Sequence, residues 1–404
     1  MNERGEGNLE KAAAEVAASL QAEGHDALFA GGCVRDRMLG LEPDDYDIAT
    51  SASPEEVLKV FPRAIGVGEF FGVMLVHSRS WPIQVATFRT EGPYSDHRRP
   101  DHVSAATLEE DAARRDFTIN GMYWDPTSSR LIDLHGGEAD LRNKVIRAIG
   151  DPEDRLREDH LRMLRAVRFA SRLGFEIDNN TQSVVRSQAS RLEGISRERI
   201  GEEVRRMLLD RNRSSAASLL SNLGLNEVVL GRSFETKSYR YLESLPNELP
   251  REDYGIVLAA WSLDLGGDEV SEVWREKLML SNADRDSMVQ VLDIVSQIQS
   301  LWQGLSVARQ KRLAAKSHFQ ASVSMVSVLA PGLAEEVSQT FDHLSQSELA
   351  PEPLIGGKDL IQAGYKAGPG FTRVIDGVYD AQLEGRVVTM NEAMEMASRL
   401  WSEL

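Results

Sequence analysis

Two aspartates separated by a single tyrosine, Asp45 and Asp47, are the residues of this chain best suited to chemistry. Side chains at positions i and i+2 of a β-strand point to the same face, so a strand here would bring both carboxylates to one point in space. Mg²⁺ takes a few carboxylates together with phosphate oxygens, and two such ions can stabilise the attacking and the leaving oxygen of a phosphoryl transfer. The pair therefore predicts metal-dependent nucleotide chemistry.

A glycine pair precedes these aspartates. Gly31 and Gly32 follow the apolar run 27–30 and come before a short helical segment expected to begin near Val34. Their backbone N–H groups are therefore available to a triphosphate. Taken alone, an Asp-x-Asp pair is typical of an acidic strand end, and a Gly-Gly pair is an ordinary turn. The order of strand, glycine pair, helix and acidic strand favours a nucleotide site.

The whole run GGCVRDRMLGLEPDDYDIAT resembles the first motif of the class II tRNA nucleotidyltransferase and bacterial poly(A) polymerase family. That family, which includes the CCA-adding enzymes, falls within the polymerase-β-like nucleotidyltransferases. The resemblance implies that Asp45 and Asp47 are catalytic and bind Mg²⁺. It implies that Gly31, Gly32 and Arg35 bind the triphosphate, with CTP and ATP as substrates and tRNA as partner.

A third acidic residue is usual on a later strand of this superfamily, in a run resembling E-V-x-T-F-R. The corresponding run here, QVATFR, begins with Gln84. Glutamine can coordinate through its carbonyl oxygen or hydrogen-bond a bound water, but it carries no charge to offset a dication. We expect Asp45 and Asp47 to hold both ions with help from the triphosphate, and an ordinary strand position for Gln84 stays open.

The run RRDFTING matches the family's R-R-D-F-T-x-N-A except that Gly121 replaces the alanine. Two adjacent guanidiniums are costly unless they meet an anion, and arginine is well suited to phosphate. We therefore assign Arg114 or Arg115 to the triphosphate, and Asp116 and Asn120 to sugar binding or backbone organisation. A basic turn at the start of a helix is the alternative.

The loop 90–100 contains glycine, proline and several polar side chains. It resembles the mobile loop of family members that add the terminal adenosine, and the resemblance points to Asp96, Arg98 and Arg99. This favours addition of the complete CCA or of A alone. A plain exposed loop remains the alternative.

A third motif, EDHLRMLRAVRF, spans residues 158–169. At 100° per residue, Asp159 and Arg162 fall one turn apart on the same helical face, where a surface ion pair is a common alternative. The run resembles the family's E-D-x-x-R motif, whose Asp and Arg act as a template for the incoming base. A carboxylate accepts from an exocyclic amine and a guanidinium donates to a neighbouring acceptor, which would select C and A. The assigned template residues are Asp159, Arg162, Arg165 and Arg168. Arg197, Glu198 and Arg199 in SRERI, a run that resembles the family's last neck motif, are expected to support their helix.

The elements that position these residues are also legible in the sequence. Residues 8–23 read as an amphipathic helix, and strand-like runs occupy residues 27–30, 45–50, 72–77, 83–88 and 122–124. Beyond Gly150 the pattern becomes helical. We therefore predict the α+β class, with a small α/β head followed by helices. The expected domains are a catalytic head (1–141), a neck with the template (142–212), a body (213–275) and a tRNA-binding tail (276–404).

Composition and charge limit the possible partners and location of the protein. The 404 residues carry a net charge of −17, yet residues 142–213 hold 17 Lys or Arg against 12 Asp or Glu. Because phosphate contacts depend on nearby charge, this local excess is compatible with RNA, although a solvated helical surface is the alternative. The single cysteine, Cys33, excludes an internal disulfide. The N-terminal residues lack an apolar signal segment, so we expect a cytoplasmic protein with no membrane partner.

The sequence thus predicts an Mg²⁺-dependent tRNA nucleotidyltransferase that adds CMP and AMP to tRNA 3′ ends without a nucleic-acid template. Two alternatives stay open. The first is a poly(A) polymerase of the same family, against which the run GEFFGV at residues 68–73 resembles the form found in CCA enzymes. The second is a tRNA-binding protein that has lost catalysis, for which Gln84 is the only support.

Overall fold

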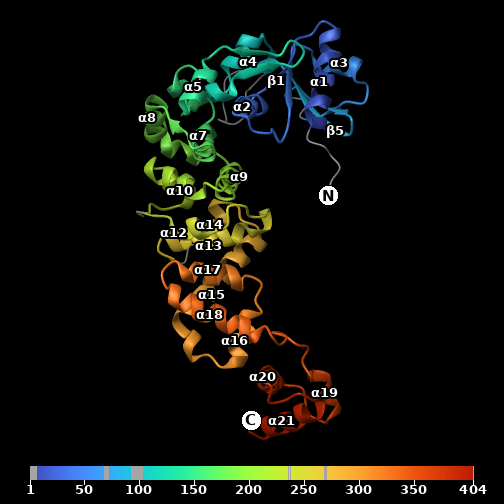
Figure 1. The fold of residues 1–404 in the computed structure, drawn as a ribbon, viewed down its shortest axis with the longest axis vertical. Coiled ribbons are helices and arrows are strands. Elements are labelled where there is room, and N and C mark those ends of the chain that lie inside the picture. The colour runs from blue at the N-terminus through green and yellow to red at the C-terminus, as the bar shows by residue number, and fades with distance from the viewer. Residues whose placement is uncertain are drawn as a thin grey trace. The chain divides into compact units, whose positions relative to one another are not determined.

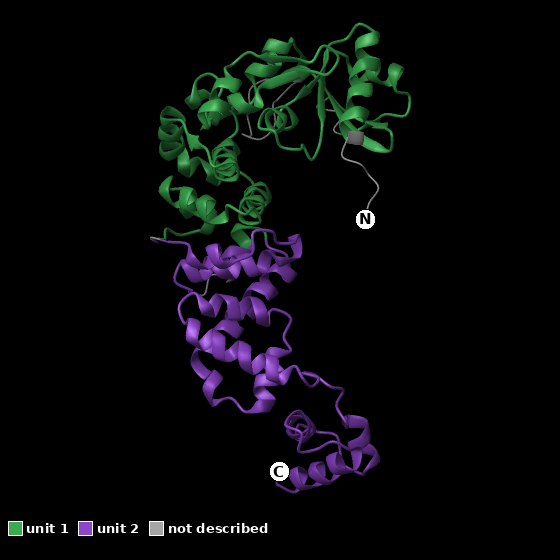
Figure 2. Cartoon of the chain, viewed as in Figure 1, with its two compact units in different colours: residues 1–235, 276–279 green, residues 236–275, 280–404 purple. Residues whose placement is uncertain are grey.

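The computed structural model describes residues 7–67, 72–91, 103–234, 236, 238–267 and 271–403. The chain divides into two compact units, residues 1–235 with 276–279 and residues 236–275 with 280–404 (Figure 2). All strands found in the described ranges belong to unit 1, and unit 2 is helical. The predicted α+β class is confirmed. No helix in those ranges combines the length and the apolar character needed to cross a bilayer.

A seven-stranded mixed sheet forms the first part of unit 1 (Figure 1). The strand order is β3-β4-β5-β2-β1-β8-β9, and only the β2–β5 pair is parallel. The strands are β1 (Ala27–Ala30), β2 (Asp47–Thr50), β3 (Ile65–Gly66), β4 (Val73–Ser78), β5 (Trp81–Thr87), β8 (Met122–Asp125) and β9 (Arg130–Asp133). Two small separate sheets pair β6 (Arg89–Glu91) with β7 (Val103–Ala105), and β10 (Val145–Ile146) with β11 (Glu176–Ile177).

The predicted strand over residues 45–50 is too long at its start. Strand β2 begins at Asp47, and Asp45 lies before it. The register of the antiparallel pair explains the difference, because Asp47 is opposite Ala30, the last residue of β1. The chain then turns at Gly31, whose φ is 74°, so β1 offers no partner to the residues before Asp47.

Helices pack against the sheet and carry the motif residues. Helix α1 (Gly7–Ala22) contacts β1, β2, β4 and β5, and α2 (Gly32–Met38) contacts β1 and β8. One hydrophobic cluster joins the sheet to α4 (Leu108–Ala113), with members Leu28, Ala30, Ala49, Phe88, Ala112 and Tyr123. This cluster fixes α4, and therefore the arginines that follow it, against the sheet. The short α3 (Pro54–Val60) begins with the expected Ser53–Glu56 capping box.

The second part of unit 1 is mainly helical. Its helices are α5 (Gly137–Asn143), α6 (Pro152–Glu158), α7 (Leu161–Leu173), α8 (Asn179–Gln188), α9 (Arg197–Leu208), α10 (Arg213–Asn222) and α11 (Asn226–Leu230). Helix α7 packs against α9 and α10. Its Leu164 and Val167 are fully buried. The arginines of α7 repeat every three or four residues, which places them along one helical face.

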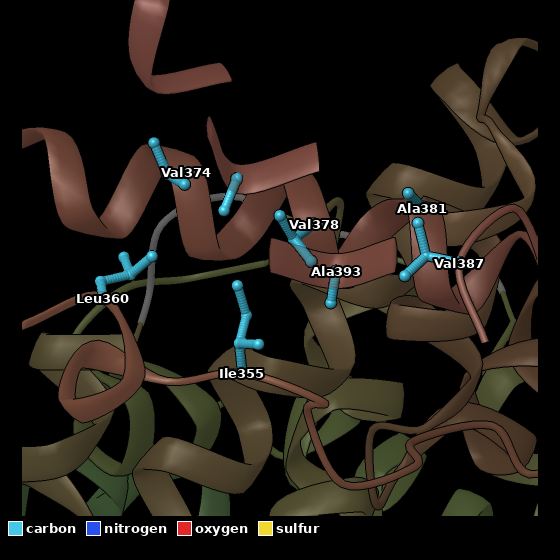
Figure 3. Packing of buried hydrophobic residues seen from close by; sticks show 8 residues of the cluster. Ile355, Leu360, Val374, Val378, Ala381, Val387 and Ala393 are labelled. Atoms are coloured by element: carbon cyan, nitrogen blue, oxygen red, sulfur yellow. The ribbon is translucent and has the colours of Figure 1, made fainter. Parts of the chain in front are cut away.

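Unit 2 consists of packed helices. They are α12 (Arg240–Ser244), α13 (Tyr254–Asp264), α14 (Ser271–Lys277), α15 (Asn282–Leu301), α16 (Val307–Ala314), α17 (Phe319–Ser327), α18 (Pro331–Leu344), α19 (Gly357–Gln362), α20 (Gly370–Leu383) and α21 (Met390–Ser402). The end of α14 belongs to unit 1. A core of small and branched side chains, including Leu360, Val374 and Val378, unites the last three helices (Figure 3). The four-domain division of the sequence stays a prediction, because two units do not separate head from neck or body from tail.

The substitution Gly201→Ala is expected to destabilise unit 1. A Cβ atom at Gly201, within α9, would lie 2.2 Å from the carbonyl oxygen of Leu278, and backbone cannot move away as a side-chain end can. Overpacking of this kind costs about 1–3 kcal/mol of the free energy of unfolding, which urea denaturation measures. Gly194→Ala is the control, because no atom lies within 4 Å of its added Cβ. Equal stability of the two variants would contradict the prediction.

Candidate active site

A cavity of about 680 Å³ in unit 1 gathers most of the motif residues. Ten arginines and four aspartates are among its lining residues. The aspartates are Asp45, Asp47, Asp116 and Asp159, and the arginines are Arg35, Arg89, Arg114, Arg115, Arg162, Arg165, Arg168, Arg172, Arg199 and Arg206. Such a surplus of guanidiniums is suited to a polyanion such as a triphosphate or an RNA backbone.

The two aspartates of the first motif meet in this cavity. Burial and the neighbouring charge of Asp45 raise the pKa of Asp47 from 3.8 to about 6, with Arg115 acting in the opposite direction. The side chain of Asp47 nevertheless keeps contact with solvent. Within the described residues, neither carboxylate has a hydrogen bond or ion pair with the protein. Arg115 offsets their repulsion only in part, since the pKa of Asp47 remains raised, as expected of oxygens that receive a cation.

Gln84 lies beside Asp47 in the sheet. The parallel register places Gln84 of β5 opposite Asp47 of β2, so their side chains share one face of the sheet. Its amide oxygen could serve as a neutral metal ligand on the same face of the sheet as Asp47. In the part of the chain that the structure describes, no three His, Cys, Asp or Glu side chains gather closely enough to hold a metal ion. A dication at Asp45 and Asp47 therefore needs further oxygens from substrate or water.

The glycine pair allows a close approach at the turn into α2. A Cβ atom at Gly31 would lie 3.2 Å from Nη1 of Arg115, and its positive φ favours glycine. The next residues are buried: Cys33 donates to the carbonyl of Ala30 at 3.4 Å, and burial raises the pKa of its thiol to about 12. Cys33 is thus a packing residue with no reactive thiolate at neutral pH.

Arg114 and Arg115 are held by one buried carboxylate. Both guanidiniums donate to Asp111, with shortest distances of 2.7 Å from Arg114 and 3.1 Å from Arg115. Asp111 was not among the predicted site residues. Its spacing of three and four residues before the arginines on a helix was a usable signal.

Asp116 is occupied by protein partners. Its Oδ2 accepts from Nε and Nη2 of Arg165 at 2.8 and 2.6 Å, and its Oδ1 accepts from the side-chain amide of Asn120 at 3.1 Å. Asn120 in turn accepts from Arg35 at 2.8 Å. Burial alone would raise the pKa of Asp116, but Arg165 and Asn120 hold it at about 2. These contacts join both side chains to protein partners at the edge of the cavity, and the roles assigned to Asp116 and Asn120 stay predictions.

The side chains of Asp159 and Arg162 do not pair with each other, although the backbone N–H of Arg162 donates to the carbonyl of Asp159 at 3.0 Å. Asp159 lies between α6 and α7 and accepts from Nη2 of Arg199 at 2.6 Å. Arg162 donates from Nη1 to Glu158 at 2.5 Å and from Nη2 to the carbonyl of Arg114 at 3.1 Å. The alternative of an i,i+3 surface ion pair is therefore wrong, and so is the expectation that Asp159 belongs to the same helix as Arg162.

Two template arginines and Arg35 of the predicted triphosphate site surround an aromatic ring. Arg35, Arg165 and Arg168 place their guanidinium carbons 5.2, 5.3 and 4.3 Å from the ring centroid of Phe169, within cation–π range. Arg168 also donates to Glu203 at 2.6 Å, and both side chains are largely buried. Neither Phe169 nor Glu203 was predicted. Glu203 comes from α9, a separate element, whereas Phe169 follows Arg165 by four residues on α7, and that spacing was a usable signal.

Most of the predicted site residues thus come together. The structure places Asp45, Asp47, Gly31, Gly32, Arg35, Arg114, Arg115, Asp116, Asn120, Asp159, Arg162, Arg165 and Arg168 around the cavity. Asp96, Arg98 and Arg99 of the predicted loop lie outside the described residues. The cavity also includes four arginines absent from the predicted site, of which Arg199 was expected only to support the template helix. They are Arg89, Arg172, Arg199 and Arg206.

Comparison with known proteins agrees with this geometry. Residues 27–147 match the family described as "Poly A polymerase head domain", and residues 174–233 match "Probable RNA and SrmB- binding site of polymerase A". The CCA-adding enzyme of Geobacillus stearothermophilus is 34% identical over 92% of each chain. That of Bacillus cereus is 31% identical over 95% of this chain and 96% of its own.

Two solved structures of CCA-adding enzymes have a similar fold. The crystal structure of the Bacillus stearothermophilus CCA-adding enzyme in complex with CTP has a TM-score of 0.81 and 29% identity, covering 98% of both chains. The Thermotoga maritima CCA-adding enzyme complexed with tRNA has a TM-score of 0.70 at 20% identity, covering 99% of this chain and 97% of its own, which is a likeness of fold.

A mixed sheet that presents paired aspartates to an arginine-lined cavity, followed by helices, defines a nucleotidyltransferase. Its head resembles those of poly(A) polymerases, and its relatives match it over nearly the whole chain. The chain belongs to the family of CCA-adding enzymes.

We expect Asp47→Asn to stabilise the metal-free protein at neutral pH. A carboxyl with a raised pKa binds more protons in the folded than in the unfolded chain between its two pKa values, so stability falls as the pH rises through that window. The shift from 3.8 to about 6 would equal about 3 kcal/mol for a group without solvent contact. Solvent screening at Asp47 reduces the expected gain to about 1 kcal/mol.

Urea denaturation with a chelator, near pH 7.5 and near pH 4, measures this effect. The gain should be present at the higher pH and absent at the lower one. Asp44→Asn serves as control, because the side chain of Asp44 is 93% exposed. An equal gain at both pH values would mean that the stabilisation has another origin.

Proposed function

We propose that this enzyme adds CMP and AMP to the 3′ ends of tRNA, using CTP and ATP without a nucleic-acid template. The observation that carries the proposal is the meeting, in one cavity, of ten arginines with two aspartates whose carboxylates have no partner among the described residues. Relatives named CCA-adding enzyme, one of them solved with CTP, support the same substrates. Since tRNA ends are processed where tRNA is used, we propose a cytoplasmic location.

Asp45 and Asp47 would hold Mg²⁺, with Gln84 of β5 opposite Asp47 in the sheet. The two carboxylates fit a hard dication, because a cation between them would offset a repulsion that no described hydrogen bond or ion pair relieves. When bound, the metal would stabilise charge on the attacking and leaving oxygens. The 3′ hydroxyl oxygen of the tRNA forms a bond to the α-phosphorus of the nucleotide and releases its proton to solvent. The α–β phosphoanhydride bond breaks, and pyrophosphate leaves with the electron pair.

Other cavity residues would bind the triphosphate and select the base. Arg114 and Arg115 line the cavity, with Arg115 next to the Gly31 turn, and would bind the triphosphate, aided by the Gly31 and Gly32 backbone. Asp159 and Arg162 would read the base. Both are held in place, by Arg199 and by Glu158. Cytosine and adenine each present an amine beside an acceptor, which matches one carboxylate and one guanidinium, whereas uracil and guanine present a carbonyl at the corresponding position.

A single assay tests the function. Radiolabelled CTP and ATP are supplied with tRNA lacking the whole CCA or only the terminal A, and the products are sequenced. We expect CCA on the first substrate and A on the second. Long adenosine tails would identify a poly(A) polymerase, addition to the second substrate alone would limit the enzyme to the terminal A, and no incorporation would identify a tRNA-binding protein without catalysis.

Asp45→Ala and Asp47→Ala should each lower nucleotide addition at least about 100-fold, while tRNA affinity stays nearly unchanged. The reason is that each removes half of the proposed metal site and no arginine. Incorporation is measured at saturating Mg²⁺, and tRNA binding by filter retention. Asp44→Ala is the matched control and should remain active, because Asp44 does not line the cavity. Near-normal turnover of either variant would rule out the metal assignment.

Asp159→Ala and Arg162→Ala should relax the choice of base. A site that hydrogen-bonds a base rejects the wrong one by leaving polar groups unpaired, so we expect discrimination of CTP against UTP to fall at least about tenfold. Competition between labelled CTP and UTP measures the ratio. The control is Arg157→Ala, on the exposed side of α6. A general loss of rate with unchanged discrimination would reduce both residues to structural supports.

A further inference from the structure

Asp111 is a buried carboxylate that lies behind the cavity instead of lining it. Asp111 belongs to α4 and is 1% exposed to solvent. Oδ1 accepts from Nε and Nη2 of Arg114 at 3.0 and 2.7 Å, and from the backbone N–H of Arg89 at 3.3 Å. Oδ2 accepts from Nη2 of Arg115 at 3.1 Å and from the hydroxyl of Tyr123 at 2.7 Å. One carboxylate therefore contacts three cavity arginines, Arg114 and Arg115 through their guanidiniums and Arg89 through its backbone N–H.

Tyr123 completes the arrangement. Its hydroxyl oxygen accepts from Nε of Arg115 at 3.0 Å, and the guanidinium carbon of Arg115 lies 4.8 Å from the ring centroid. Burial alone would raise the pKa of Asp111, but Arg115, Arg114 and the Tyr123 hydroxyl hold it below its ordinary value. The carboxylate is therefore charged at neutral pH, and it offsets one of two adjacent positive charges.

We propose that Asp111 is a positioning residue that holds Arg114 and Arg115 in the geometry in which they bind the triphosphate of the incoming nucleotide. This inference rests on the proposed function and deepens it. Without the carboxylate, two neighbouring guanidiniums repel each other and gain rotamer freedom. With it, the pair presents one net positive charge and fixed donors to the cavity, so little ordering remains to be done when phosphate binds.

The position of Asp111 explains why it acts through the arginines. Both of its oxygens are already occupied, and the residue is closed to solvent, so a substrate cannot contact it. Its partners bind the phosphate end of the nucleotide and not the base. Loss of the carboxylate should therefore affect CTP and ATP by the same factor and leave base choice intact.

The test measures binding of inorganic tripolyphosphate to the full chain by titration calorimetry. Asp111→Asn keeps the size of the side chain and removes its charge. A misplacement of about 1 Å can cost about 100-fold, so we expect affinity for tripolyphosphate to fall about tenfold or more. A change within about twofold, or no measurable binding by the unaltered protein, would overturn the proposal.

Asp140→Asn is the matched control. Asp140 is similarly buried and accepts from Thr118 at 2.7 Å and from Arg147 at 3.1 Å, but Arg147 is not a lining residue of the described cavity. Both variants lose a buried, ion-paired carboxylate in the same unit. If Asp140→Asn weakens tripolyphosphate binding as much as Asp111→Asn does, the effect is general destabilisation and the proposal fails.

Kinetics separate this proposal from the proposed function. For Asp111→Asn, KM for CTP and for ATP should rise by the same factor, kcat at saturation should change less, and discrimination against UTP should stay the same. Altered discrimination would contradict a role at the phosphate end. If the unaltered protein binds tripolyphosphate in an Asp111-dependent way yet transfers no nucleotide, the proposed function fails and the positioning role stands.

Tyr123→Phe provides a second variant should Asp111→Asn not fold. It keeps the ring, which packs edge-on against Phe88 with centroids 6.4 Å apart, and removes only the hydroxyl that links Asp111 to Arg115. We expect a severalfold loss of tripolyphosphate affinity. Unchanged affinity would contradict the proposal.

Discussion

The constraint on which the site depends is the repulsion among guanidiniums that share one cavity. Two unit charges about 5 Å apart repel by roughly 3 kcal/mol at an effective dielectric of 20. Ten arginines line the cavity of a protein whose net charge is −17. Carboxylates outside the lining contact them in pairs: Asp111 holds Arg114 and Arg115, and Glu203 holds Arg168 at 2.6 Å and Arg165 at 3.9 Å. The local positive field is therefore compatible with a stable fold.

The same constraint assigns different tasks to the carboxylates. Asp111, Asp116 and Glu203 are largely buried and paired, so they organise the arginines. Asp45 and Asp47 line the cavity without a protein partner among the described residues, so a dication is the natural partner for them. In the proposed function, the groups that bind the triphosphate and read the base are held by protein partners, whereas the two aspartates are left for the metal.

Much of the site could be predicted from sequence because its motifs are local. The order of strand, glycine turn, helix and aspartate pair is written in one run of residues, and β1 (Ala27–Ala30) was predicted with its observed bounds. Asp45 was placed wrongly on the strand, since the register that ends β2 depends on where β1 turns. The pairing of Asp159 with Arg199, and of Arg165 with Asp116, joins separate elements, and spacing within one helix could not reveal it.

A crystal structure of the protein with an unreactive CTP analogue and Mg²⁺ would test the account most directly. We expect metal density between Asp45 and Asp47. The triphosphate should lie against Arg114 and Arg115, and the cytosine edge should face Asp159 and Arg162. Asp111 should still bridge the two arginines, with Arg199 and Glu158 still holding the base-reading pair. A nucleotide bound elsewhere, or one in this cavity with its phosphates turned away from Asp45 and Asp47, would contradict the account.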